Sequence, residues 1–78
     1  MTPLRKARKT KGWSLLDVVK RLEMLDYQSD VGNLSRVERG VQRASTELAE
    51  ALANVIGRSL VTEMQILYPE RYEQQEVA

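Results

Sequence analysis

The segment from Ser14 to Leu22 constrains the fold of this chain more than any other stretch, because its pattern fits an amphipathic helix and not a strand. Ser14 occupies an N-cap position, and Asp17, three residues later, is placed to complete a capping box. Apolar residues then recur at helical spacing on one side: Leu15, Val18, Val19 and Leu22. We therefore expect a helix that buries one face and exposes the other.

Two further helices are predicted by a capping residue at their start and a glycine at their end. Thr2 is placed to cap a first helix, Pro3 suits its first position, and Gly12 follows its last residue. Ser45 is placed to cap a fourth helix, whose apolar stripe runs as far as Gly57. Neither segment shows the alternation that a strand requires.

A third helix is predicted after a polar connector at residues 25–30, with Ser29 or Asp30 as its cap. Its apolar residues fall in one narrow angular sector and are expected to face the core: Leu34, Val37 and Val41. The opposite side is polar and basic and carries a glycine. Glycine is an unfavourable choice for a helix that is merely solvated, so this side is a candidate for function.

A short fifth helix is predicted to start at Thr62, with Gln65 completing a capping box, and to stop at Pro69. Together the segments predict an all-α fold, a compact five-helix domain over residues 1–69. We expect residues 73–78, which are polar, to form a flexible tail.

Cysteine and histidine are both absent from the sequence, which restricts its chemistry. Disulfides, thiolate metal sites and the usual pairing of a nucleophile with a histidine base are excluded. No glycine-rich loop follows a strand, so a phosphate-binding cradle is not predicted. We expect neither an enzyme nor a bound metal or cofactor. No segment has the pattern of a signal peptide or a membrane span, so we expect a cytoplasmic protein.

The net charge of +1 hides an asymmetry between the two halves of the chain. Residues 1–43 hold twice as many basic as acidic residues, whereas residues 44–78 hold three times as many acidic as basic ones. This asymmetry favours a basic working surface and an acidic far side. The alternative is an ordinary solvated run of charges on the first helix.

Residues 33–40 read Asn-Leu-Ser-Arg-Val-Glu-Arg-Gly, and this order resembles the recognition helix of the XRE family, the helix-turn-helix type of phage repressors and Cro. Residues 4–15 are similar to that family's first helix and the start of its second, and residues 48–53 to its fourth. The resemblance covers about residues 3–57. It implies that helix two crosses the DNA backbone and helix three enters the major groove. The connector departs from the family by about five extra residues over the usual turn, which either lengthen the second helix or form a loop.

Three residues on the outer side of the predicted third helix suit contacts with base edges in the major groove. Arg36 can donate two hydrogen bonds to O6 and N7 of guanine, and Asn33 can pair with N6 and N7 of adenine. Gly32 has no side chain and would let the backbone approach DNA closely. The alternatives are a solvated surface arginine at position 36 and a simple helix-start residue at position 33.

Five residues are candidates for phosphate contacts, because helix N-termini, hydroxyl groups and cations suit phosphate oxygens: Lys11, Ser14, Arg39, Arg43 and Ser45. The two serines can also act as helix caps alone, and the two roles are compatible. The resemblance to the XRE family further implies a structural ion pair between Arg8 and Glu38 that links the first helix to the third.

The segment from about residue 58 to residue 72 carries more apolar residues than one short helix can bury. Six of them are expected to form a homodimer surface: Leu60, Met64, Ile66, Leu67, Tyr68 and Tyr72. The alternative is that these residues complete the small core of the domain. A chain of this size buries little surface by itself, which favours a partner subunit.

These expectations combine into a sequence-specific double-stranded DNA-binding protein, a homodimeric transcriptional regulator that acts as a repressor or autoregulator at an operator. A phage Cro-like protein and a controller of a restriction system both fit this description. The rival hypothesis is an antitoxin-like or adaptor protein that uses the same fold mainly to bind a protein partner through its apolar carboxyl-terminal segment. No membrane association is expected.

Overall fold

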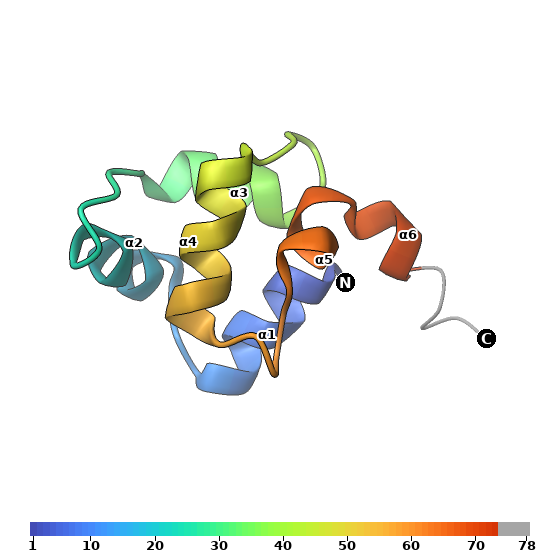
Figure 1. Cartoon of the computed structure of the whole chain (residues 1–78), viewed down its shortest axis with the longest axis horizontal. Helices are drawn as coiled ribbons and strands as arrows, with labels where there is room; N and C mark the ends of the chain where they lie inside the picture. The colour runs from blue at the N-terminus through green and yellow to red at the C-terminus, as the bar shows by residue number, and fades with distance from the viewer. Residues whose placement is uncertain (74–78) are drawn as a thin grey trace.

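Polar side chains cap the start of five helices in the computed structural model, which describes residues 1–73. Each cap oxygen accepts a hydrogen bond from the backbone N–H three residues later: Thr2, Ser14, Asp30, Ser45 and Thr62. The helices of the described chain are α1 (Pro3–Lys11), α2 (Leu15–Glu23), α3 (Val31–Glu38), α4 (Thr46–Ile56), α5 (Glu63–Leu67) and α6 (Pro69–Glu73) (Figure 1). These caps confirm the predicted helix starts and identify Asp30 as the cap of α3.

The hydrophobic core is built around α4, which packs against α1, α2 and α5. In Figure 1, α4 runs through the middle of the molecule, with α2 on one side and α5 and α6 on the other. The most deeply buried large side chains come from α2, α3, α4 and the segment before α5: Leu22, Leu34, Leu52, Ile56 and Val61. Residues 1–73 contain no strand, so the all-α prediction is confirmed. None of their helices is long and apolar enough to cross a membrane.

A sixth helix corrects the five-helix prediction at Pro69. Tyr68 leaves the helical conformation with φ −130° and ψ 62°, which ends α5. Pro69 then takes the first position of α6 instead of stopping helical structure. Proline suits that position because its missing N–H would have no partner in the first turn. α6 packs against α1 and α5, and it ends at Glu73, while the remainder of the predicted tail lies outside the described residues.

The carboxyl end of α3 also differs from the prediction. Arg39 is the C-cap, and Gly40 follows with a φ of 75°. The N–H of Gly40 donates to the carbonyl of Val37 (3.1 Å), and the N–H of Val41 to that of Arg36 (3.0 Å), which is a Schellman motif. This turn directs Val41 away from the core and leaves it 69% exposed, so its predicted place on the inner face is wrong.

The connector between α2 and α3 is a loop and does not extend α2. α2 ends at Glu23, and Asp26 adopts a positive φ of 59° in the turn that follows. The N–H of Tyr27 donates to the carbonyl of Leu22 (3.0 Å), and the Tyr27 side chain packs against the core. The extra residues therefore lead the chain back to the body of the protein before α3 begins.

Candidate nucleic-acid interface

α3 has one face buried in the core and one face open to solvent. Leu34 and Val37 on the inner face are almost completely buried. On the outer face Gly32 and Arg36 are exposed and Asn33 is half-buried. The three residues predicted to contact bases therefore share one accessible surface.

An ion pair with α1 fixes the inner side of α3. The Arg8 guanidinium donates through Nε to Glu38 Oε2 and through Nη2 to Glu38 Oε1, the latter at 3.0 Å. Its Nη1 donates to the carbonyl of Trp13 (2.6 Å), and the Thr2 hydroxyl donates to the Glu38 carbonyl. The ion pair expected from the family resemblance is present, and it anchors the end of α3 to the second half of α1, while the Thr2 hydrogen bond anchors it to the start of that helix.

A glutamine in the turn after α3 joins the two polar side chains of the outer face. Gln42 Oε1 accepts a hydrogen bond from Arg36 Nε (2.9 Å), and Gln42 Nε2 donates one to Asn33 Oδ1 (2.7 Å). Asn33 Nδ2 in turn donates to Ser29 Oγ (3.4 Å). We call Arg36, Gln42, Asn33 and Ser29 the outer-face relay, because their side chains form one continuous line of hydrogen bonds.

Gly32 lies beside the Asp30 cap and the Arg36 guanidinium. A Cβ atom at position 32 would lie 3.5 Å from Arg36 Nη1 and 3.2 Å from Asp30 Oδ1. The Asp30 carboxylate is already held by the backbone N–H of Asn33 (2.7 Å), so it has little freedom to move aside. A Cβ atom there would thus make ordinary contact with the guanidinium but would be tight against the Asp30 carboxylate, so the glycine relieves crowding at the cap of α3.

The two serines predicted to contact phosphates stand at helix N-termini and act as caps. Ser14 Oγ accepts from the N–H of Asp17 (3.1 Å), and Ser45 Oγ accepts from the N–H of Leu48 (3.1 Å). The Ser14 N–H donates back to Asp17 Oδ2 (2.9 Å). The hydrogen bond from the Ser14 backbone lowers the pKa of the Asp17 carboxyl below its usual value of 3.8, and the Ser14 hydroxyl lowers it further by a smaller amount. Both serines are exposed, so their hydroxyl groups keep a face open to solvent.

Two of the cations predicted to contact phosphates are exposed and bear no carboxylate partner within the described residues. The side chain of Arg39 donates only to the carbonyl of Ser35 (Nε to O, 3.3 Å). The Nζ of Lys11 lies 5.6 Å from the centre of the Trp13 ring. Arg21 covers the same ring at 4.0 Å. No hydrogen bond in residues 1–73 joins Lys11, or either serine, to the outer-face relay.

Arg43, the remaining predicted phosphate contact, is engaged by the carboxyl-terminal segment. Its Nη2 donates to Glu70 Oε1 (3.1 Å), and its Nη1 donates to the carbonyl of Leu67. Its guanidinium also lies 5.1 Å from the centre of the Tyr68 ring. A backbone hydrogen bond at Glu70 and the Arg43 guanidinium together lower the pKa of the Glu70 carboxyl. The charge of Arg43 is thus directed toward α6.

The structure divides the six residues predicted to form a dimer surface. Ile66 is only 3% exposed and belongs to the core, so its assignment to an interface is wrong. Its burial follows from the position of α5, which packs against α4 along its inner side. Leu67, Tyr68 and Tyr72 are half-buried. Leu60 and Met64 are the most exposed of the six, at 37% and 46%.

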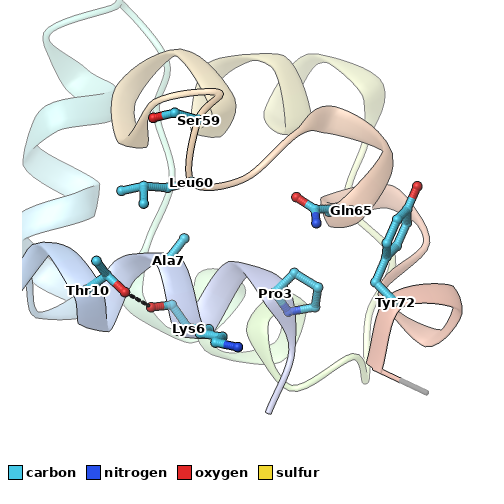
Figure 2. A pocket seen from close by; sticks show the side chains of 8 residues that line it. All are labelled: Pro3, Lys6, Ala7, Thr10, Ser59, Leu60, Gln65 and Tyr72. Carbon is cyan, nitrogen blue, oxygen red and sulfur yellow. Dashed lines mark hydrogen bonds between the residues drawn. The ribbon is translucent and has the colours of Figure 1, made fainter. Parts of the chain in front are cut away.

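A groove of about 320 Å³ separates α1 from the carboxyl-terminal segment. Figure 2 shows Pro3, Lys6, Ala7 and Thr10 of α1 along one side, facing Ser59, Leu60, Gln65 and Tyr72. The Thr10 hydroxyl donates to the carbonyl of Lys6 (2.9 Å) within α1. No residue of α3 lines this groove, so it is separate from the outer-face relay.

Neither Ser29, which was expected only as a possible helix cap, nor Gln42 was predicted as a site residue of this surface. A signal for Gln42 exists, because Gly40 at the end of a predicted helix favours a turn that folds the next residues back along that helix.

Within residues 1–73, no three acidic side chains gather into a possible metal site.

No protein-family model, curated protein or solved structure matches this chain.

Proposed function

We propose that this protein binds double-stranded DNA sequence-specifically, as a homodimeric transcriptional regulator of the repressor-type helix-turn-helix class that its sequence resembles. The observation that carries the proposal is the outer face of α3, where Gln42 holds the polar groups of Asn33 and Arg36 together at the surface. A major groove admits one α-helix, and a helix that reads bases there needs such donors on its outer side.

The guanidinium of Arg36 suits recognition of guanine. Its Nε donates to Gln42, and its Nη1 and Nη2 make no hydrogen bond within the described residues. These two nitrogens form the outer edge of the fork, which can donate in parallel to O6 and N7 of one guanine. Asn33 supplies the matching contact to a neighbouring adenine.

Phosphate contacts would surround this surface. α2 packs against α3, so in the proposed complex it crosses the DNA backbone while α3 lies in the groove. Ser14 and Ser45 offer helix N-termini and hydroxyl groups to phosphate oxygens, and Lys11 and Arg39 offer exposed cations. Arg43 joins them only if it exchanges Glu70 for a phosphate.

The proposed dimer surface keeps five of the six predicted residues: Leu60 and Met64, which are exposed, and Leu67, Tyr68 and Tyr72, which are half-buried. Two-fold symmetry would place two α3 helices on successive half-sites about 34–36 Å apart. The same exposed pair also favours the second candidate function, an adaptor or antitoxin-like protein that binds another protein through this segment. A DNA-binding homodimer accounts for the α3 surface as well, which the second candidate leaves unused.

The test is selection of bound sequences from random duplexes, followed by affinity measurements at several salt concentrations. We expect a pseudo-palindromic motif that contains guanine and adenine in each half. With Lys11 and Arg39 at phosphates, the slope of log K against log salt is expected to be about −1.8 per protomer, and about −2.7 when Arg43 also contacts a phosphate. A flat salt dependence, or no selected motif, would contradict the proposal.

A further inference from the structure

The outer-face relay points to a specificity-determining role for a residue outside the recognition helix. Resting on the proposed function, we propose that Gln42 couples Arg36 to Asn33, so that the two side chains read adjacent base pairs as one unit. Gln42 is a positioning residue in this account, because it acts through the two side chains that touch the bases.

The chemistry of Arg36 fixes the direction of every bond in the relay. A guanidinium has only donors, so the Gln42 amide must present its oxygen to Arg36. Its NH₂ group therefore faces Asn33, which must present an oxygen in return. The NH₂ group of Asn33 is then directed to the Ser29 hydroxyl, an acceptor. A free asparagine amide would rotate between two orientations, and the relay selects one of them.

The selected orientation leaves Asn33 with the hydrogen-bonding groups that adenine requires. An amide oxygen accepts two hydrogen bonds and an amide NH₂ group donates two. Gln42 uses one acceptor position of Asn33, and Ser29 uses one donor. One acceptor and one donor remain, which match the N6–H and N7 of adenine. Arg36 keeps its Nη pair for guanine, so one relay sets both contacts.

The backbone holds Gln42 in the position that this role needs. Gly40 turns the chain back along α3, and the N–H of Gln42 donates to the carbonyl of Arg36 (3.3 Å). Gln42 is therefore tied to Arg36 through its backbone as well as its side chain. Because the long side chains of Arg36 and Gln42 are already ordered by their hydrogen bond before DNA binds, less conformational entropy is lost on binding. Gln42 itself is exposed and contributes nothing to the core.

The test replaces Gln42 by methionine, which keeps the length of the side chain and removes both hydrogen bonds. Discrimination should fall about threefold to tenfold at the adenine position, where a neutral hydrogen bond is lost, and at least about tenfold at the guanine position, where the lost bond comes from a charged guanidinium. Affinity for random duplex, its salt slope and the melting temperature should not change. Asn54→Ala is the matched control, because Asn54 is an exposed amide that also accepts from an arginine, Arg58, but lies near the carboxyl end of α4.

The outcomes separate this inference from the proposed function. A wild-type protein that selects no motif overturns both. A wild-type motif that Gln42→Met leaves unchanged overturns the inference alone, and so does loss of preference at a third position only, which would mean that Gln42 touches a base itself. In a double-mutant cycle, Gln42→Met should have little further effect at the guanine position once Arg36 is alanine. Additive effects there would also overturn the coupling.

Discussion

α3 and α5 are both short helices that bury one side, yet their outer sides differ in chemistry. α3 has 8 residues and α5 has 5, and each contributes a nearly inaccessible side chain to the core, Leu34 and Ile66. The outer side of α3 presents Asn33 and Arg36, whereas that of α5 presents Met64. The first surface offers directed hydrogen-bond donors, and the second offers an exposed apolar side chain.

The arginines near the carboxyl end and the arginine on the outer side of α3 differ in their partners. Near the carboxyl end, Arg43 pairs with Glu70 and Arg58 pairs with Glu63, so a carboxylate matches each of these two charges. On α3, Arg36 is held by the neutral amide of Gln42, and its charge has no carboxylate partner within the described residues. The comparison indicates that the surface of α3 is suited to an anionic partner and the surface near α5 to an apolar one.

The largest effect is expected from a charge placed on the inner side of α5. Ile66→Glu should abolish cooperative folding, because an unpaired carboxylate would be buried in the core. Met64→Glu places the same charge on the outer side and should leave a folded protein that is monomeric and binds its operator weakly. Helical circular dichroism and light scattering distinguish the two variants. A folded Ile66→Glu variant would contradict the division between inner and outer sides, and a dimeric Met64→Glu variant would move the interface elsewhere.

A second prediction contrasts two arginines at the carboxyl end of α3, one in a buried ion pair and one exposed. Arg8→Ala leaves the Glu38 carboxylate buried without its partner and should lower the free energy of unfolding by about 3–5 kcal/mol. Arg39→Ala removes an exposed cation at the end of the same helix and should change stability by less than about 0.5 kcal/mol. Urea denaturation of both variants tests this contrast. Equal losses would mean that the Arg8–Glu38 pair does not anchor α3.

Features that depend on nearby residues were predictable from the sequence. The caps at Thr2, Ser14, Ser45 and Thr62 were expected because each capping bond spans three residues of the chain. The Schellman turn was less visible, since a helix of uninterrupted period would have carried Val41 to the inner face. Gly40 overrides that period.

Features that depend on distant residues were not predictable in the same way. A helix of five residues is too short for its period to show which side is buried. The sequence therefore could not distinguish Ile66, which is in the core, from Met64, which is exposed. The bond of Arg43 to Glu70 joins residues that only the sixth helix brings together. The role of Gln42 follows only from two facts taken together: the turn after α3 brings it back along the helix, and Arg36 can only donate hydrogen bonds.

The central claim is that the outer side of α3 reads base edges, and Arg36→Ala tests it most directly. Affinities of the wild-type and variant proteins are measured at one salt concentration on the selected operator and on a scrambled duplex. The account predicts a loss of about 1–3 kcal/mol on the operator, relaxed preference at one base position in each half-site, and a much smaller loss on the scrambled duplex. Equal losses on both duplexes would mean that Arg36 contacts phosphate only, and an unchanged operator affinity and motif would contradict the proposed orientation of α3.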